Sequence, residues 1–242
     1  QSAWNYRLCG RYIGKEVKEM KSKTLKKILV AALGVVMAVS LAACGSSSSS
    51  SSSSGSSAKK DYSKVSVNKA KKSISFYATV NGTYFTQATR HYIVTKGKTN
   101  GDKSLLRAYP SELKIYNGLK AVGGKPWDGM KIEQKGQKTQ GEKVAVTLSW
   151  KGSNGEVPAA KTVKTASGAA PKIDFRYSGN LKNAKKYNVG CIACLDSCYV
   201  GIISNAAYGY GDIEGGKVKT MGNSKVLPKD GTVVKVTFTL KD

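Results

Sequence analysis

Three cysteines, Cys191, Cys194 and Cys198, lie close together in the stretch from Asn188 to Tyr199. A thiolate is both a nucleophile and a soft metal ligand. The spacing C-x2-C-x3-C therefore limits the chemistry to metal binding, an iron–sulfur cluster or thiol–disulfide exchange. No other segment concentrates reactive side chains in this way.

An iron–sulfur cluster is the first alternative. Bacterial ferredoxins use C-x2-C-x2-C-x3-C-P. When the three cysteines are aligned with the last three of that motif, Asn188 stands in place of the first cysteine and Tyr199 in place of the proline. A cluster here would have three thiolate ligands.

Zinc is the second alternative, with His91 as the fourth ligand of a closed tetrahedral site. His91 is the only histidine of the chain. A single histidine beside a strand is typical of a structural role, so we do not expect His91 to be a ligand.

Thiol chemistry is the third alternative, because Cys191 and Cys194 have the spacing that lowers a thiol pKa in oxidoreductases. A disulfide from either one to Cys198 would leave a third thiol free for exchange. In an exported protein the disulfide could equally be structural. The spacing leaves the three alternatives open.

Other groups of residues give weaker evidence of a functional site. A serine-hydrolase triad has no support from one histidine and no G-x-S-x-G motif. Several tyrosines surround the cysteines and could line a pocket for a planar ligand, although half-buried strand tyrosines are the more common case. They are Tyr177, Tyr187, Tyr199, Tyr208 and Tyr210.

The N-terminal part of the sequence predicts where the protein is located. Residues 20–43 combine a basic start with a short apolar core and end in Leu41-Ala42-Ala43, which is typical of a secretory signal. Cys44 follows directly, as in the lipobox of bacterial lipoproteins, and this resemblance implies lipidation of Cys44 after cleavage. Two acyl chains anchor a protein stably. We expect a lipid-anchored protein on the extracytoplasmic face of the cell membrane, and residues 1–19 as a non-native or upstream segment.

Residues 44–61 form a Ser/Gly-rich linker, and the folded domain is expected over 62–242. Without residues 1–43, the chain keeps 32 Lys and Arg and 13 Asp and Glu, a net charge of +19. A location outside the cytosol excludes a nucleic-acid partner. There the positive charge favours anionic envelope polymers, and a surface redox partner is the other expected partner. The lipid anchor makes the membrane itself a partner.

The domain is mostly predicted strand, with alternating residues over 72–80, 142–150 and 232–240. Further strands are expected at 83–86, paired through an Asn81-Gly82 hairpin, and at 90–95, 103–109, 171–177 and 199–204. One helix is predicted from an N-cap at Ser111 to Gly123. We therefore expect an α+β fold, mainly antiparallel β, with sandwich-like sheets and one packed helix.

A family resemblance covers most of residues 74–240. The stretches 91–106, 110–126, 144–150 and 190–208 together resemble the YdjY-domain family. The resemblance implies a cysteine cluster of ferredoxin-like type at Cys191, Cys194 and Cys198, usually followed by proline where this chain has Tyr199. It implies no activity for particular residues.

Two functions remain as hypotheses. The first is a membrane-anchored protein whose cysteine cluster performs redox or metal-linked work, by thiol–disulfide exchange or iron–sulfur electron transfer. The alternative is a non-enzymatic envelope binding or scaffold protein with structural cysteines. The cofactor is undetermined between an iron–sulfur cluster and zinc, and an enzymatic activity is neither indicated nor excluded.

Overall fold

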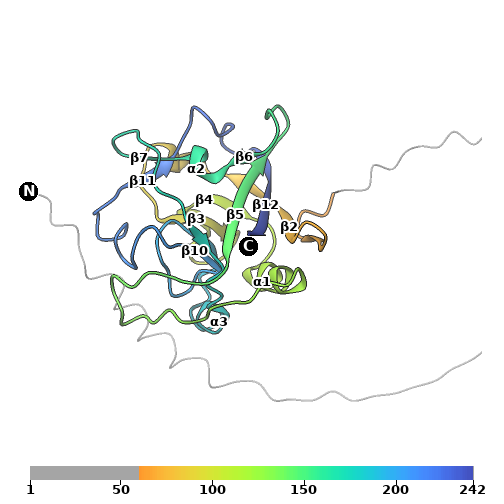
Figure 1. The fold of residues 1–242 in the computed structure, drawn as a ribbon. Coiled ribbons are helices and arrows are strands. Elements are labelled where there is room, and N and C mark those ends of the chain that lie inside the picture. The colour runs from red at the N-terminus through yellow and green to blue at the C-terminus, as the bar shows by residue number, and fades with distance from the viewer. Residues whose placement is uncertain (1–59, 242) are drawn as a thin grey trace, which may run out of the picture. The chain divides into compact units, whose positions relative to one another are not determined.

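A computed structural model describes residues 60–241 of the chain (Figure 1). The predictions for residues 1–59, namely the upstream segment, the signal peptide, Cys44 and most of the linker, lie outside the described residues. In the described part, no helix has the length and apolar character needed to cross a bilayer.

Eight strands close into a barrel, because the last strand in the ring pairs with the first. Their order is β2 (Ser73–Val80), β12 (Val233–Lys241), β5 (Lys143–Ser149), β8 (Phe175–Arg176), β10 (Ile203–Asn205), β9 (Cys191–Cys194), β3 (His91–Thr95) and β4 (Ser104–Ala108). Two short strands pair with barrel strands: β1 (Ser66–Asn68) with β2, and β6 (Val157–Pro158) with β5. A separate pair consists of β7 (Val163–Thr165) and β11 (Thr220–Gly222). Neighbouring strands in the ring are antiparallel except β3–β4 and β9–β10.

The predicted sandwich is therefore wrong. Alternation of apolar and polar residues shows that a strand has one buried face, and both a sandwich and a barrel need such strands. What distinguishes them is strand pairing. Here β2 pairs along one side with β12 and along the other with β4, so the sheet has no free edge at β2.

The barrel core comes from the alternating residues of the long strands. In β2, Ile74, Phe76, Ala78 and Val80 are buried, and β12 and β5 bury their alternate residues in the same way. The rings of Phe76 and Phe238 meet edge to face with centroids 5.1 Å apart. As expected, the two alternating stretches 142–150 and 232–240 lie in one sheet, since β5 and β12 are paired.

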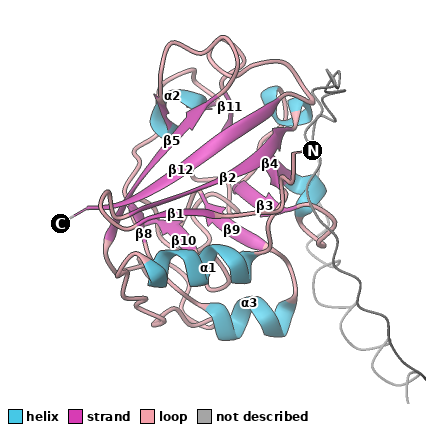
Figure 2. Ribbon diagram, turned by 90° about the vertical axis from the view of Figure 1, so that its right-hand side faces the viewer, coloured by secondary structure: helices cyan, strands magenta, loops and turns pink. Residues whose placement is uncertain are grey.

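Within residues 60–241, three α-helices and two 3-10 helices accompany the barrel, so the expectation of one helix is corrected. The predicted helix is α1 (Glu112–Ala121), and the Ser111 side chain accepts a hydrogen bond from the Lys114 amide at its start. The helices α2 (Ala159–Thr162) and α3 (Leu181–Tyr187) were not predicted, because they are too short for a helical period to stand out. Figure 2 shows α1 and α3 side by side next to the barrel strands.

The predicted hairpin at Asn81-Gly82 is also wrong. Residues Gly82–Phe85 form the 3-10 helix η1, and the second 3-10 helix, η2, spans Gly101–Lys103. The Asn81 side chain instead donates hydrogen bonds to the carbonyls of Asp102 and Ser104, which ties the end of β2 to the start of β4. The stretches 171–177 and 199–204 contain the short strands β8 and β10 rather than full-length ones.

Candidate metal centre

Two of the three cysteines belong to strand β9, which is one of the barrel strands. It consists of Cys191–Cys194 and lies between β10 and β3. Residues three apart in a regular strand point to opposite faces of the sheet. The register of β3 and β9 shifts twice, between His91 and Ile93 and between Ile93 and Val94. Such irregularities redirect side chains, and here both cysteines reach the same small cluster.

The three thiols form a buried group of their own. Cys191 and Cys194 are fully buried and Cys198 is 2% exposed. They pack with Val94 and Val200 in a cluster separate from the main core. All three are free rather than joined in a disulfide. The structure thus brings together all the cysteines that the sequence singled out in this domain, without the disulfide considered for them.

His91 lies next to the same group. It begins β3 and pairs with Cys194 in the strand register. Its Nδ1 lies 3.7 Å from Sγ of Cys191, and the ligand atoms of His91, Cys191 and Cys194 all lie within 4.8 Å of one another. Burial, followed by the charge of Arg90, lowers the pKa of His91 to about 4. The imidazole is therefore neutral at pH 7, as a metal ligand must be.

The three thiols differ in their pKa values. Hydrogen bonds from Cys191 and Cys194 lower the pKa of Cys198 well below its ordinary value, and Arg90 adds to this effect against the cost of burial. Hydrogen bonds with the other two thiols and burial raise the pKa of Cys194. For Cys191 the bond with Cys194 lowers the pKa, but the bond with Cys198 and burial together raise it. Of the three thiols, Cys198 therefore loses its proton most readily.

Arg90 and the buried Asp196 form an ion pair close to Cys198. Arg90 donates to Oδ1 of Asp196 from Nε at 3.0 Å and from Nη2 at 2.9 Å, and its Nη1 donates to Glu214 at 2.9 Å. Burial alone would lower the pKa of Arg90, but the charges of Cys198 and Asp196 raise it. Burial raises the pKa of Asp196 to about 7 although Arg90 acts to lower it. A fixed positive charge thus lies against the thiol group.

Sequence reasoning did not single out Arg90 or Asp196. The available signals were weak: Asp196 lies between Cys194 and Cys198, and Arg90 directly precedes the only histidine. The two residues are 106 positions apart, so their contact depends on the pairing of β3 with β9.

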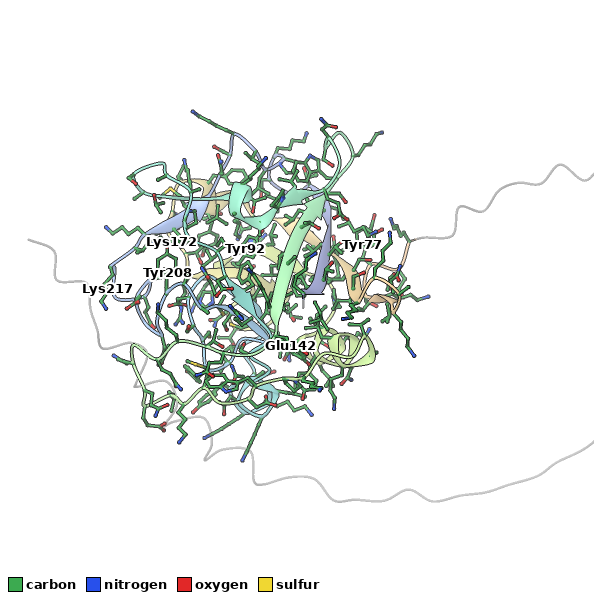
Figure 3. All side chains as sticks on the ribbon, in the orientation of Figure 1. Tyr77, Tyr92, Glu142, Lys172, Tyr208 and Lys217 are labelled. Carbon is green, nitrogen blue, oxygen red and sulfur yellow. The ribbon has the colours of Figure 1, made fainter. Side chains whose placement is uncertain are left out.

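The tyrosines near the cysteines pack on one another. Tyr199 meets Tyr187 and Tyr210 edge to face, with ring centroids 5.4 Å and 5.3 Å apart. Tyr177 is buried, with its hydroxyl bonded to the Tyr116 carbonyl. Tyr208 lies beside Lys172, whose amide donates to its hydroxyl (Figure 3). Such contacts fit the packing of half-buried tyrosines better than a pocket for a planar ligand.

The fold and the site together define a small β-barrel domain with a buried group of three thiols and an imidazole. The family model described as the YdjY domain matches residues 65–239, and the chain belongs to that family. It is similar to the "Uncharacterized protein YdjY" of Escherichia coli (strain K12), with 33% identity over 215 residues, 88% of this chain and 95% of the relative. No solved structure matches the chain.

Proposed function

We propose that this chain is a lipid-anchored extracytoplasmic protein that holds a single thiophilic metal ion at His91, Cys191, Cys194 and Cys198. The observation that carries the proposal is the packing of three buried free thiols in one cluster, with an imidazole nitrogen 3.7 Å from Sγ of Cys191. Three sulfur donors and one nitrogen suit Zn²⁺ or Cu⁺. The ion would be closed off from substrate, so its role would be to stabilise the domain or to be stored and passed on.

The separation of the donors supports one ion rather than a cluster. Sulfur atoms about 2.3 Å from a tetrahedral ion lie roughly 3.8 Å from one another. The ligand atoms of His91, Cys191 and Cys194 lie within 4.8 Å of one another, which is compatible with that separation. A cluster would put its irons and sulfides between the thiolates and hold them further apart.

The surrounding charge also suits a metal–thiolate site. Three thiolates and a divalent ion carry a net charge of −1, and burying an unpaired charge is costly. The Arg90 guanidinium lies next to Cys198, with its side chain 13% exposed, and offsets this charge. The ion pair of Arg90 with Asp196 fixes the position of the guanidinium.

Thiol–disulfide exchange fits the site less well. Exchange requires a thiolate that another molecule can reach. Cys198, the thiol with the lowered pKa, is 2% exposed, and the other two cysteines are fully buried. A partner would have to open the barrel at β9 to reach them.

The location proposed here rests on residues 20–44. The charged start, the apolar core and Leu41-Ala42-Ala43-Cys44 occur in the order that export and lipidation require. Similarity to the Escherichia coli relative covers 88% of the chain, which is more than residues 65–239 make up. A single ion is also compatible with export, because an unfolded chain can cross the membrane and bind the ion afterwards.

Metal analysis of the purified full chain tests both parts. Purified without oxygen, the protein is expected to contain about one zinc or copper ion per chain and no inorganic sulfide. Cys198→Ser and His91→Ala should lower the metal content, whereas Cys44→Ser, the same exchange as at Cys198 but at a cysteine that is not a proposed ligand, should keep the ion.

Mass spectrometry of the same preparations tests the anchor. The protein expressed with its own N-terminal segment should carry a diacylglycerol group on Cys44 and lose it in Cys44→Ser. Metal-free protein with an intact fold would remove the metal proposal and favour the scaffold alternative. Bound iron with sulfide would replace the single ion by a cluster. An unmodified Cys44 would remove the anchor without affecting the metal result.

A further inference from the structure

An open pocket lies directly against His91 and Arg90. Its volume is about 450 Å³, which is within the usual range for small-molecule sites. One wall is the segment from η1 to the start of β3, and the other is the loop between β10 and β11. The residues that line it are Tyr84, Ala88, Thr89, Arg90, His91, Lys103, Ile213, Glu214, Gly216 and Lys219.

The charges in this pocket do not cancel. The Arg90 guanidinium pairs with Glu214, which lines the pocket, and with Asp196, which does not. Lys103 and Lys219 are both exposed, and no hydrogen bond or ion pair within residues 60–241 engages their ammonium groups. The pocket therefore presents two uncompensated positive charges, and Lys ammonium groups attract anions as point charges.

The same pocket has an apolar side. Ile213 is 8% exposed, and the Tyr84 ring is packed against the main core while its edge lines the pocket. Ala88 adds a small side chain that leaves the space open. A ligand that uses both sides must combine a negative group with a short apolar body, whereas a bare inorganic anion would leave the apolar wall uncovered.

We propose that this pocket binds a small organic carboxylate, with its charge between Lys103 and Lys219 and its body against Tyr84 and Ile213. The bound molecule would lie against His91, which is a wall of the pocket and a member of the thiol group. The site goes beyond the metal centre and does not depend on it, because none of the contacts that form the pocket requires an ion.

Benzoate is a suitable probe, because it joins one carboxylate to a flat apolar ring. In an NMR titration of the full chain, kept metal-free with a chelator, benzoate should give saturable shifts of amide signals from Thr89, Arg90, Ile213 and Gly216. Benzyl alcohol has the same ring without the charge and should bind at least fivefold more weakly.

Variants separate the pocket from general charge. Lys103→Gln with Lys219→Gln should weaken benzoate binding at least fivefold, since two ammonium–carboxylate attractions are lost. Lys120→Gln with Lys182→Gln removes the same charge from α1 and α3 and should leave binding unchanged. Ala88→Trp keeps every charge but fills the space, and should also abolish binding.

The proposal is overturned if benzyl alcohol binds as well as benzoate, if both pairs of lysine changes have equal effects, or if no saturable shift occurs at millimolar benzoate. Repeating the titration with metal-loaded protein keeps the two proposals apart. Benzoate binding in a chain that takes up no metal would support the pocket and remove the metal centre. Metal uptake without benzoate binding would do the reverse.

Discussion

Cys198 differs from the other two cysteines in its acidity. Its pKa is lowered by hydrogen bonds from Cys191 and Cys194 and by Arg90, so it is the most acidic thiol of the three. Cys191 and Cys194 have raised pKa values and keep their protons. A metal ion that binds all three sulfurs must therefore displace two protons.

This proton count predicts that metal affinity rises with pH. Below the raised pKa values of Cys191 and Cys194, each proton displaced adds about a factor of ten in affinity per pH unit, so two give roughly 100-fold. His91, whose pKa is about 4, is neutral near pH 7 and adds no proton. Competition for Zn²⁺ against a chelator of known affinity, between about pH 6 and 8, measures the slope. A pH-independent affinity would exclude the two thiols as ligands.

The turn between α3 and β9 sets the direction in which β9 enters the barrel. Asn188 and Gly190 both have left-handed backbones, with φ values of 51° and 77°. A Cβ atom at Gly190 would lie 2.6 Å from Cβ of Lys98. The Gly190 carbonyl accepts a hydrogen bond from the Thr95 amide, which holds the turn against β3. The position of Cys191 thus depends on a glycine directly before it.

Gly190→Ala is expected to disturb the metal centre as well as stability. The left-handed backbone alone costs about 1 kcal/mol with a side chain, and the close contact with Lys98 brings the loss to about 2–3 kcal/mol. Gly155→Ala is the matched control, because Gly155 has a φ of 73° and nothing near its Cβ position. Urea unfolding and zinc affinity of both variants measure the difference. Equal effects in the two variants would show that the contact at Gly190 is relieved without cost.

The barrel as a whole depends on long-range pairing. In the ring, β2 from the start of the domain sequence pairs with β12 from its end. The strands β3 and β9, which are also far apart in the sequence, pair with each other. Cys191 and Cys194 lie in the wall of this ring, and Cys198 lies in the segment that joins β9 to β10. Opening the barrel should therefore also open the thiol group, and the domain should unfold in one step.

Leu148→Ala tests this dependence from a distance. Leu148 is fully buried in β5 and is not part of the thiol cluster. The cavity left by the change should lower the free energy of unfolding by about 2–5 kcal/mol. Lys235→Ala, at an exposed position of β12, should change it by less than about 0.5 kcal/mol. Tyrosine fluorescence and the thiol reactivity of the cysteines should follow one transition; two separate transitions would contradict a single cooperative barrel.

The charge of the whole molecule supports the proposed contact with an anionic envelope. The exposed sides of α1 and α3 carry Lys120, Lys182, Lys185 and Lys186, and the only acidic residue of these two helices, Glu112, is buried and bonded to Thr95. A surface of this kind attracts anionic headgroups. Attraction between exposed charges also weakens as salt is added.

The non-lipidated Cys44→Ser chain is accordingly expected to bind vesicles of anionic phospholipid at low salt. About 0.5 M NaCl should release it, because the screening length falls to a few ångströms. Co-sedimentation measures the bound fraction, and vesicles of neutral phospholipid are the control. Binding that is unaffected by salt would rule out an electrostatic contact.

Local patterns in the sequence determined the parts of the fold that depend on near neighbours. Alternating residues predicted β2, β5 and β12, since a strand with one buried face must alternate whatever it pairs with. Ser111 and the glycines after Val122 predicted α1, because capping acts within one turn of a helix. The family could likewise be inferred from the sequence.

Tertiary structure alone decided the closure of the barrel and the membership of the site. The pairing of β2 with β4 has no local signature, so a barrel could not be told from a sandwich. His91 and Cys191 are 100 residues apart and meet only through the irregular register of β3 and β9. Spacing along the chain identifies ligands that share a turn or a strand. A ligand from another strand is found only when the pairing is known.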